Sequence, residues 1–368
     1  MARPVRHHHQ SSRSEPPPYL FITIGVVCIL SLLALLIVVV KFGSVFPETT
    51  LAFSRIGGVS VIKQEAPQLD HVAYDHKMRA IANLVPVSTS SSSTPALWPV
   101  KAPYPNAGAL LPFNRIVAYY GNFYSKGMGV LGQYPEDVML AKLQKEVDAW
   151  KTADPATPVI PAIHYIVTTA QELPQKDGTY TLRMPDDQID YALEIANKIN
   201  ALVFLDFQIG KSTLQKELPQ YEKYLAMPNV HLGIDPEFSM KTGAKPGREI
   251  GAFDATDVNY AANYLATLVR EHHLPPKVLI VHRFTLDMVT HYKKITPLPE
   301  VQIVMDMDGW GDPEKKVGTF TRVIASEPVQ FTGFKLFYKN DLLPPSKAML
   351  MPKQLLELSP QPIYIQYQ

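Results

Sequence analysis

The chain has 368 residues, of which 46% are hydrophobic, and its formal net charge is only +1. This composition is typical of a globular protein, and the near-neutral charge excludes the basic surface that nucleic-acid binding requires, so no nucleic-acid partner is expected. A single cysteine, Cys28, also excludes a fold held together by internal disulfide bonds.

An apolar segment without charged residues occupies positions 19–40. At a rise of 1.5 Å per residue, a helix of this length spans about 33 Å, which is enough to cross the hydrocarbon layer of a bilayer. The segment therefore predicts a transmembrane signal anchor in contact with lipid. The alternative is a cleaved signal peptide, which needs a shorter apolar core and a small-residue cleavage site that residues 41–50 do not provide.

Charge and composition on the two sides of this segment predict the topology. The tail 1–18 carries three arginines, more positive charge than the short stretch after the span. The positive-inside rule therefore predicts a cytoplasmic tail and a single-pass cell-membrane protein whose C-terminal domain is extracytoplasmic. Residues 41–111 are interpreted as a stalk, because 88–105 form a Ser/Pro-rich linker, although 68–85 favour one amphipathic helix.

From residue 112 to 368, short apolar runs alternate with polar, helix-like stretches. The predicted strands are 115–122, 158–167, 201–208, 229–238, 277–285, 301–309, 331–338 and 362–368. The predicted helices between them include 136–151, 186–200, 213–227 and 254–273, with caps at Asp186 and Asp254.

Eight strand–helix repeats predict an α/β fold, a (β/α)8 TIM-type barrel formed by residues 112–368. A doubly wound open sheet is the alternative, but no glycine-rich phosphate loop follows the first strand. The sequence stops on the eighth predicted strand, so the predicted barrel lacks its last helix. We expect part of residues 44–111 to cover that side of the barrel.

Alternate residues along each predicted strand separate into an apolar face and a polar face. On the sixth strand, Ile303 and Met305 share one face, whereas Asp306 and Asp308 share the other. The apolar face must meet the helices, so the polar side chains point into the barrel, mostly near the carboxyl ends where barrel enzymes build their sites. These inward residues are Tyr120, Asn122, His164, Asp206, Gln208, Asp235, Glu237, His282, Asp306, Asp308, Lys335 and Gln366.

Five carboxylates converge in the predicted mouth: Asp206, Asp235, Glu237, Asp306 and Asp308. Unpaired carboxylates repel one another and lose hydration, so stability alone selects against such a cluster and a functional site is predicted. Glycoside hydrolysis needs a protonated carboxylic acid and a second group at the other face of the sugar. Glu237 is the predicted general acid, with Asp235 one layer below it.

The remaining candidates complete this hypothesis. Asp308 or Asp206 would be the nucleophile, the base or the electrostatic partner of the acid, and the chemistry requires no cofactor and no metal ion. The predicted ligand is a polysaccharide or another small molecule in the barrel mouth. The predicted substrate-binding residues are Tyr120, Asn122, His164, Gln208, His282, Asp306, Trp310, Lys335 and Gln366.

The stretch "GIDPEF" and the eight-strand layout resemble glycoside-hydrolase barrels, including chitinase-like and lysozyme-like ones. Chitinases carry D-x-x-D-x-D-x-E, and Val230 and Gly233 occupy its first two aspartate positions here, so only Asp235 and Glu237 carry over. The commoner glycosidase barrels place a nucleophilic Glu after strand seven, where this chain has Lys335. Residues 112–368 also resemble a family of bacterial membrane-anchored surface barrel proteins without an established activity, and this resemblance supplies no residue roles.

Two other classes of function fit the same residues. A metal-dependent hydrolase could use His164, Asp206, His282 and further inward carboxylates as zinc or manganese ligands. Barrel metallohydrolases usually begin with paired histidines on strand one, however, and residues 115–122 contain none. A non-catalytic carbohydrate-binding or structural surface protein is the third class, because fold does not guarantee activity. Metal content and turnover on polysaccharide separate the three.

The predicted orientation determines how a reporter fused to Gln368 should behave. A reporter that is active only in the cytoplasm should give no signal there, because the C-terminal domain lies across the membrane. Reporter activity in whole cells checks this expectation, with the same reporter fused ahead of Met1 as the positive control. A signal from the C-terminal fusion would show that the orientation is wrong.

Overall fold

The structure is a computed structural model of the chain, and it describes residues 53–56, 59–62, 68–84 and 96–368. The chain divides into two units, Met1–Glu65 and Ala66–Gln368. In the first unit, strands β1 (Phe53–Ile56) and β2 (Val59–Ile62) pair in antiparallel fashion. Within the described ranges no helix is both long and apolar enough to span a bilayer, and the predicted span 19–40 lies outside them.

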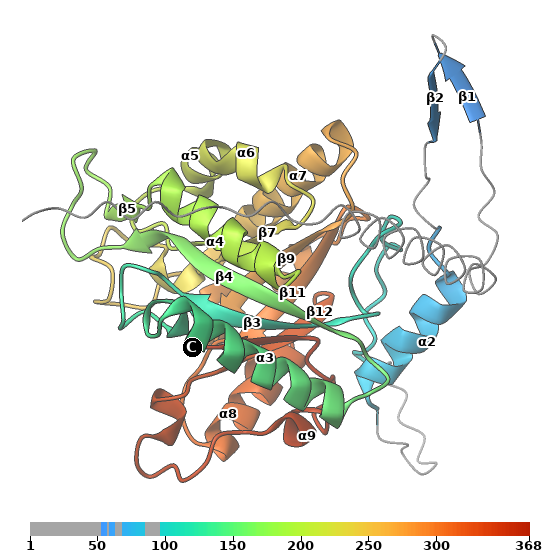
Figure 1. Cartoon of the computed structure of the whole chain (residues 1–368). Coiled ribbons are helices and arrows are strands. Elements are labelled where there is room, and N and C mark those ends of the chain that lie inside the picture. The colour runs from blue at the N-terminus through green and yellow to red at the C-terminus, as the bar shows by residue number, and fades with distance from the viewer. Residues whose placement is uncertain (1–52, 57–58, 63–67, 85–95) are drawn as a thin grey trace, which may run out of the picture. The chain divides into compact units, whose positions relative to one another are not determined.

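In the second unit, eight of the described strands pair in parallel and close into a barrel (Figure 1). Strand β3 pairs with β4 on one side and with β13 on the other, which closes the ring. The predicted closed barrel of eight parallel strands is therefore confirmed, and all eight predicted strands are present. The predicted strand–helix alternation is incomplete, because no α-helix lies in the described segment between the strands Lys277–Arg283 and Val301–Met307. The barrel strands are β3 (Arg115–Gly121), β4 (Val159–Ala170), β6 (Leu202–Phe207), β7 (Val230–Ile234), β9 (Lys277–Arg283), β11 (Val301–Met307), β12 (Phe331–Leu336) and β13 (Tyr364–Tyr367).

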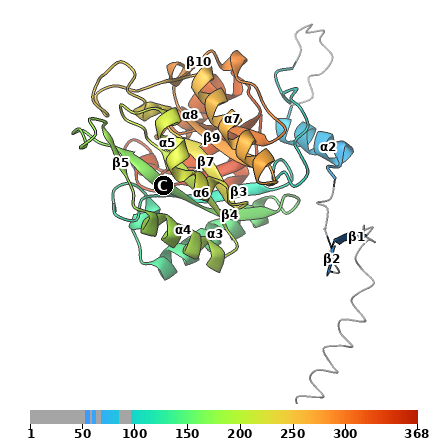
Figure 2. The ribbon, with the colours of Figure 1, turned by 90° about the horizontal axis from the view of Figure 1, so that it is seen from above.

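Short strands lie outside the ring of eight. Strand β5 (Thr181–Arg183) pairs in antiparallel fashion with the end of β4, and β8 (Phe253–Asp254) pairs with β10 (Val289–Thr290). The helices lie around the outside of the barrel (Figure 2). They are α3 (Glu136–Ala153), α4 (Asp186–Lys198), α5 (Leu214–Glu217), α6 (Glu222–Leu225), α7 (Ala255–Glu271), α8 (Pro313–Thr319), which continues as a π-helix over Phe320–Ala325, and α9 (Pro352–Leu355).

Local sequence explains where these helices begin and break. The predicted cap at Asp254 is confirmed, because its side chain accepts a hydrogen bond from the Thr256 amide and Asp257 completes a capping box. The predicted cap at Asp186 is wrong, since Pro185 occupies the cap position and Asp186 is the first helical residue. The predicted helix 213–227 is broken into α5, a 3₁₀ turn and α6, because Pro219 lacks the amide hydrogen that a continuous helix needs.

Helix α2 (His71–Ala82) closes the end of the barrel at which the strands begin (Figure 1). Its buried residues Tyr74 and Met78 belong to one apolar cluster with inward-facing side chains such as Phe204 and Val304. This position differs from the expected one, because the described part of residues 44–111 covers the barrel's end and not its side. The boundary predicted at residue 112 therefore separates segments that pack together in one unit.

The side of the barrel next to the last strand is covered by helix α3. The Trp150 indole of α3 donates a hydrogen bond of 3.0 Å to the Tyr367 hydroxyl on β13, and both side chains are buried. The segment before β3 is fastened to β11 by Gln302, whose amide oxygen accepts from the Leu110 and Leu111 amides at 3.0 Å each. The end of the barrel at which the strands begin, called its lower end, is thus covered by α2, and the side beside β13 is covered by α3.

The position of α2 predicts that Met78→Ala lowers the free energy of unfolding by about 2–5 kcal/mol, because truncating a buried methionine leaves a cavity. Met78 is 6% exposed, whereas Val72 on the same helix is 78% exposed, so Val72→Ala is the matched control and should leave stability unchanged. Urea unfolding of the purified protein measures both. Equal midpoints for the two variants would show that α2 does not contribute to the barrel's stability.

Candidate active site

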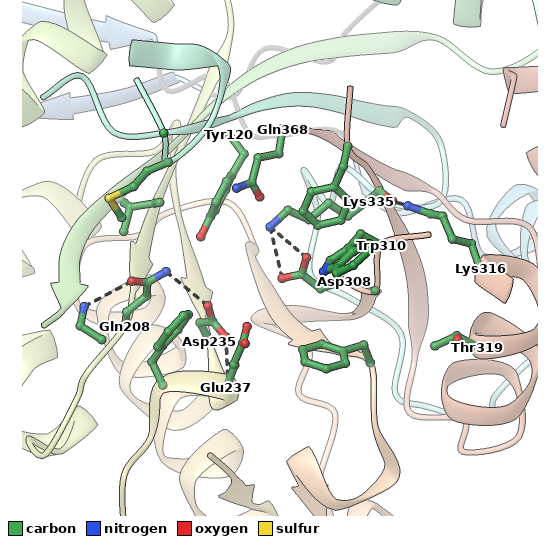
Figure 3. Close-up of a pocket in the computed structure, with 18 of the residues that line it drawn as sticks. Tyr120, Gln208, Asp235, Glu237, Asp308, Trp310, Lys316, Thr319, Lys335 and Gln368 are labelled. Carbon is green, nitrogen blue, oxygen red and sulfur yellow. Dashed lines mark hydrogen bonds and ion pairs between the residues drawn. The ribbon is translucent and has the colours of Figure 1, made fainter. Parts of the chain in front are cut away.

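The carboxyl ends of the barrel strands surround a cavity of about 700 Å³, here called the mouth cavity (Figure 3). This volume lies within the range of sites that bind small molecules. The residues predicted from the sequence that line it are Tyr120, Gln208, Asp235, Glu237, Asp308, Trp310 and Lys335.

The other inward residues lie one layer deeper, as the two-residue period of a strand requires. Asp206 precedes Gln208 by two positions on its strand, and Asp306 precedes Asp308 in the same way. The side chains of this layer are completely buried, and they do not line the mouth cavity. They are His164, Asp206, His282, Asp306 and Gln366.

Asp206 is the centre of the deeper layer. Its Oδ2 accepts a hydrogen bond from the Tyr120 hydroxyl at 3.0 Å, and its Oδ1 lies 3.1 Å from Nε2 of both His164 and His282. Burial by itself raises the pKa of Asp206, but the charge of His282 and the two histidine hydrogen bonds outweigh it and hold the pKa below its ordinary value. Burial lowers the pKa of His164 to about 4.

His282 and Asp306 form the less satisfied part of this layer. His282 Nδ1 lies 3.3 Å from Oδ2 of both Asp306 and Asp308, and neither contact has hydrogen-bond geometry. Both carboxyl oxygens of Asp306 and the amide oxygen of Gln366 have no hydrogen-bond partner among the described residues. Burial accordingly raises the pKa of Asp306, because an unpaired charge in this environment is costly.

Two inward glycines provide the space that these side chains occupy. A Cβ atom at Gly233 of β7 would lie 2.3 Å from Asp206 Oδ1 and 2.5 Å from His164 Nε2. A Cβ atom at Gly333 of β12 would lie 2.5 Å from Asp306 Oδ1. Real Cβ contacts are never this short, so any larger residue would displace the deeper layer.

In the upper layer, Lys335 holds Asp308 at the cavity wall. The Lys335 ammonium lies 2.9 Å from Asp308 Oδ1, and it also lies over the Tyr120 ring, 3.8 Å from the ring centroid. Both side chains of the ion pair are nearly buried. The lysine on strand seven is therefore paired with one of the aspartates that the sequence predicted for the site.

Glu237 faces the same cavity from the end of β7. The Asp235 side chain accepts a hydrogen bond of 3.1 Å from the Glu237 amide and so caps the short 3₁₀ helix Pro236–Phe238 that carries the glutamate. Burial, reinforced by the nearby charge of Asp308, raises the pKa of Glu237 to about 7. Burial raises the pKa of Asp235 well above its ordinary value too, so this carboxyl favours its neutral form.

Two further predicted substrate-binding residues, Asn122 and Trp310, lie in a loop and at the cavity rim. Asn122 does not line the cavity, because its amide donates to the Ile166 carbonyl at 3.0 Å and its oxygen accepts from the Tyr124 amide, which fixes the loop after β3. Trp310 lines the mouth cavity, is 49% exposed, and lies beneath the ammonium of Lys315 at 5.0 Å from the ring centroid.

Sequence reasoning missed part of the lining that comes from helices and loops. The missed residues in the lining include Phe238, Phe284, Lys315 and Arg322. Lys315 and Arg322 lie on α8 and the π-helix, where strand periodicity carries no information. The two inward glycines were missed as well, although a glycine at an inward barrel position between acidic neighbours is a signal of close approach.

The fold and the site together define a (β/α)8-barrel protein with an acidic cavity at the carboxyl ends of its strands. No protein-family model matches the chain, and no curated protein sequence matches it. Solved structures with a similar fold include a tri-modular GH5 endo-β-1,4-glucanase from Bacillus licheniformis, with 10% identity and a TM-score of 0.35 over 70% of this chain and 55% of that chain. The chain thus spans about half the length of this glucanase.

Two further solved structures show the range of the similarity. A Bacteroides ovatus GH5 xyloglucanase has 11% identity and a TM-score of 0.35 over 76% of this chain and 75% of that chain. A Burkholderia cenocepacia dihydropteroate synthase has 9% identity and a TM-score of 0.31 over 70% of this chain and 86% of that chain. At these scores the similarity carries no argument about function, which has to rest on the residues of the site.

The space left by Gly233 predicts that Gly233→Ala destabilises the protein by about 1–3 kcal/mol, because the new methyl group overpacks against Asp206 and His164. Gly318→Ala is the matched control, since Gly318 lies in α8 with no atom within 4 Å of the added Cβ. The control should be unchanged or more stable by about 0.5–1 kcal/mol. Thermal unfolding compares them, and an unaffected Gly233→Ala variant would contradict the packing of the deeper layer.

Proposed function

We propose that this chain is a glycoside hydrolase acting on a polysaccharide, with Glu237 as the general acid. The observation that carries this proposal is that the largely buried Glu237 side chain faces the same cavity as Asp308, which is ion-paired with Lys335. Burial and the nearby charge of Asp308 raise the pKa of Glu237 to about 7. Glycosidic bond cleavage uses a carboxyl group that is still protonated near neutral pH together with a charged carboxylate. In this cavity Glu237 is the carboxyl group with the raised pKa, and Asp308 is the carboxyl group that is ion-paired with Lys335.

Each group has a defined task in this mechanism. Glu237 donates its proton to the glycosidic oxygen as the bond to the leaving group breaks. Asp308, held by Lys335, faces the positive charge that develops at the anomeric carbon, either as a nucleophile or as an electrostatic partner. Asp235 positions the acid through the turn that it caps.

The lining of the cavity supports a carbohydrate as the ligand. Its wall combines the polar groups described above with the aromatic side chains of Phe238, Phe284, Trp310 and Phe337. Half-exposed Trp310 at the rim offers a flat apolar face on which a sugar ring can stack. The proposal includes the predicted membrane anchor at 19–40 with an extracytoplasmic C-terminal domain. The proposed substrate is therefore a cell-surface or environmental polysaccharide.

Glu237→Gln is the direct test of the acid. The substitution keeps shape and hydrogen bonding but removes the transferable proton, so kcat should fall by about 10²–10⁴-fold while substrate binding is preserved. Release of reducing ends from a panel that includes peptidoglycan and exopolysaccharides measures turnover. Wild-type activity should also decline as pH rises through about 7, because the acid loses its proton there.

Stability separates a catalytic carboxyl from a structural one. Folding raises the pKa of Glu237 from 4.5 to about 7, so the folded protein favours the neutral carboxyl group. The contribution of this group to the free energy of unfolding is fully present below pH 4.5 and is lost as pH rises through about 7. Glu237→Gln should therefore match the wild type at pH 4 and exceed its stability at pH 8, by on the order of 1–3 kcal/mol. The exposed Glu172→Gln is the control and should change neither property.

Three outcomes decide the proposal. Loss of turnover in Glu237→Gln with binding retained supports it, as does a similar loss in Asp308→Asn. Unchanged turnover in Glu237→Gln would show that this residue is not the acid. Saturable polysaccharide binding by a wild type that releases no products would identify a non-catalytic binding protein instead.

A further inference from the structure

Three donor side chains from three strands meet below the mouth cavity. His164 of β4, Asp206 of β6 and His282 of β9 are completely buried, and one ligand atom from each lies within 4.8 Å of the others. In the part of the chain that the structure describes, this is the one group of His, Cys, Asp or Glu residues with such spacing. It belongs to the layer beneath the proposed catalytic carboxyls and lines no part of their cavity.

The spacing of the donor atoms suits a small cation. Asp206 Oδ1 lies 3.1 Å from His164 Nε2 and 3.1 Å from His282 Nε2. Ligands at about 2.0–2.2 Å from a tetrahedral zinc ion are separated by about 3.3 Å, which is close to both distances. Two imidazoles and one carboxylate are donors that first-row transition metals accept, whereas calcium and magnesium prefer oxygen ligands alone.

The opposite end of each donor side chain faces another buried group, and hydrogen bonds hold two of the three. His164 Nδ1 lies 2.6 Å from the Tyr364 hydroxyl, and Asp206 Oδ2 accepts from Tyr120. His282 Nδ1 faces the carboxyl groups of Asp306 and Asp308. Such outer partners orient the histidine and carboxylate ligands of metal ions. They also determine which ring nitrogen or carboxylate oxygen is available to the ion.

Unpartnered buried groups and an inward glycine complete this evidence. Asp306 is completely buried, and both of its carboxyl oxygens have no hydrogen-bond partner within the described residues, 3.3 Å from the outer nitrogen of His282. A cation bound at Nε2 of His282 would leave the proton of this ring on Nδ1, the atom that faces this carboxyl group. On the side of β7, Gly233 is the residue that leaves Asp206 Oδ1 and His164 Nε2 uncovered.

We propose that His164, Asp206 and His282 bind one divalent first-row transition metal ion, with zinc as the reference ion, beneath the mouth cavity. The ion ties β4, β6 and β9 together across the barrel interior and offsets the charge of the carboxylates above it. It does not line the cavity and takes no part in the acid step assigned to Glu237. The site therefore stands or falls independently of the proposed hydrolase activity.

The experiment uses the full chain purified without a histidine tag or a chelator. Residues His7, His8 and His9 could bind metal themselves, so all measurements are made in a background in which these three are alanine. Elemental analysis after dialysis against metal-free buffer, and again after incubation with Zn²⁺, should find about one ion per chain. Less than about a tenth of an equivalent in both samples would overturn the proposal and leave a hydrogen-bonded His–Asp–His network.

Substitutions identify the ligands. Asp206→Asn and His282→Gln keep the shape of the side chains but should lose the bound ion. His231→Asn is the matched control, because His231 is buried on the neighbouring strand, where its Nδ1 accepts from the Val278 amide at 3.1 Å, and it should retain the ion. Glu237→Gln should also retain the ion while losing turnover, which distinguishes failure of this site from failure of the acid.

A measurement on the unsubstituted site covers the case in which the ligand variants do not fold. Protein depleted of metal is titrated with Co²⁺, and the visible absorption of the bound ion should saturate at one equivalent and disappear on addition of excess Zn²⁺. Zn²⁺ should also raise the Tm of the depleted protein, because an ion that binds only the folded state stabilises it. A titration without saturable absorption, or a full ion content in Asp206→Asn, would show that the assignment is wrong.

Discussion

The hydrogen bonds to the Asp206 carboxylate are the interactions on which the polar part of the barrel interior depends. The carboxylate receives Tyr120 from β3, His164 from β4 and His282 from β9, so one side chain joins the polar groups of three other strands. A buried carboxylate without partners is costly, and these three donors supply the compensation. The other carboxyls then divide into an ion pair, Asp308 with Lys335, and groups whose pKa is raised, which keeps the total buried charge small. Among them Glu237 is the one whose pKa falls near neutrality.

The barrel interior consists of three layers of side chains, one apolar and two polar. The apolar layer is the lowest, with Ile116, Phe204 and Val304 packed against Tyr74 and Met78 of α2. Above it lie the deeper polar layer around Asp206 and then the upper layer at the cavity wall, with Asp308 and Lys335. Helix α2 covers the end of the barrel at which the strands begin, and the carboxyl groups of Asp235 and Asp306 near the other end are buried, which raises their pKa. Because its side chains are apolar and packed against α2, the lowest layer supplies stability that the crowded polar layers cannot.

The sequence predicted the strands and most of the site for one physical reason. Buried barrel strands must present apolar side chains to the helices at every second position, so Ile303 and Met305 reveal which way Asp306 and Asp308 point. The predictions that were wrong concern features that depend on contacts between residues distant in the chain. Helix α2 was predicted as a helix but not as the barrel's lower lid, because periodicity identifies an apolar face and not its partner. Asn122 was predicted to bind substrate, although its amide is used to fix a loop.

Strand β7 shows how tightly the register of one strand controls the site. Gly233 is an inward residue of this strand, and Asp235 and Glu237 follow its end, with Glu237 on the short 3₁₀ helix. Each of the three has a different task. Gly233 leaves room for the His–Asp–His group, Asp235 caps the turn, and Glu237 reaches the cavity. A slip of one residue would turn Leu232 and Ile234 inward and remove all three features together. The pairing of Gly233 with both Asp206 of β6 and Ile280 of β9 therefore determines the deeper layer and the proposed acid at the same time.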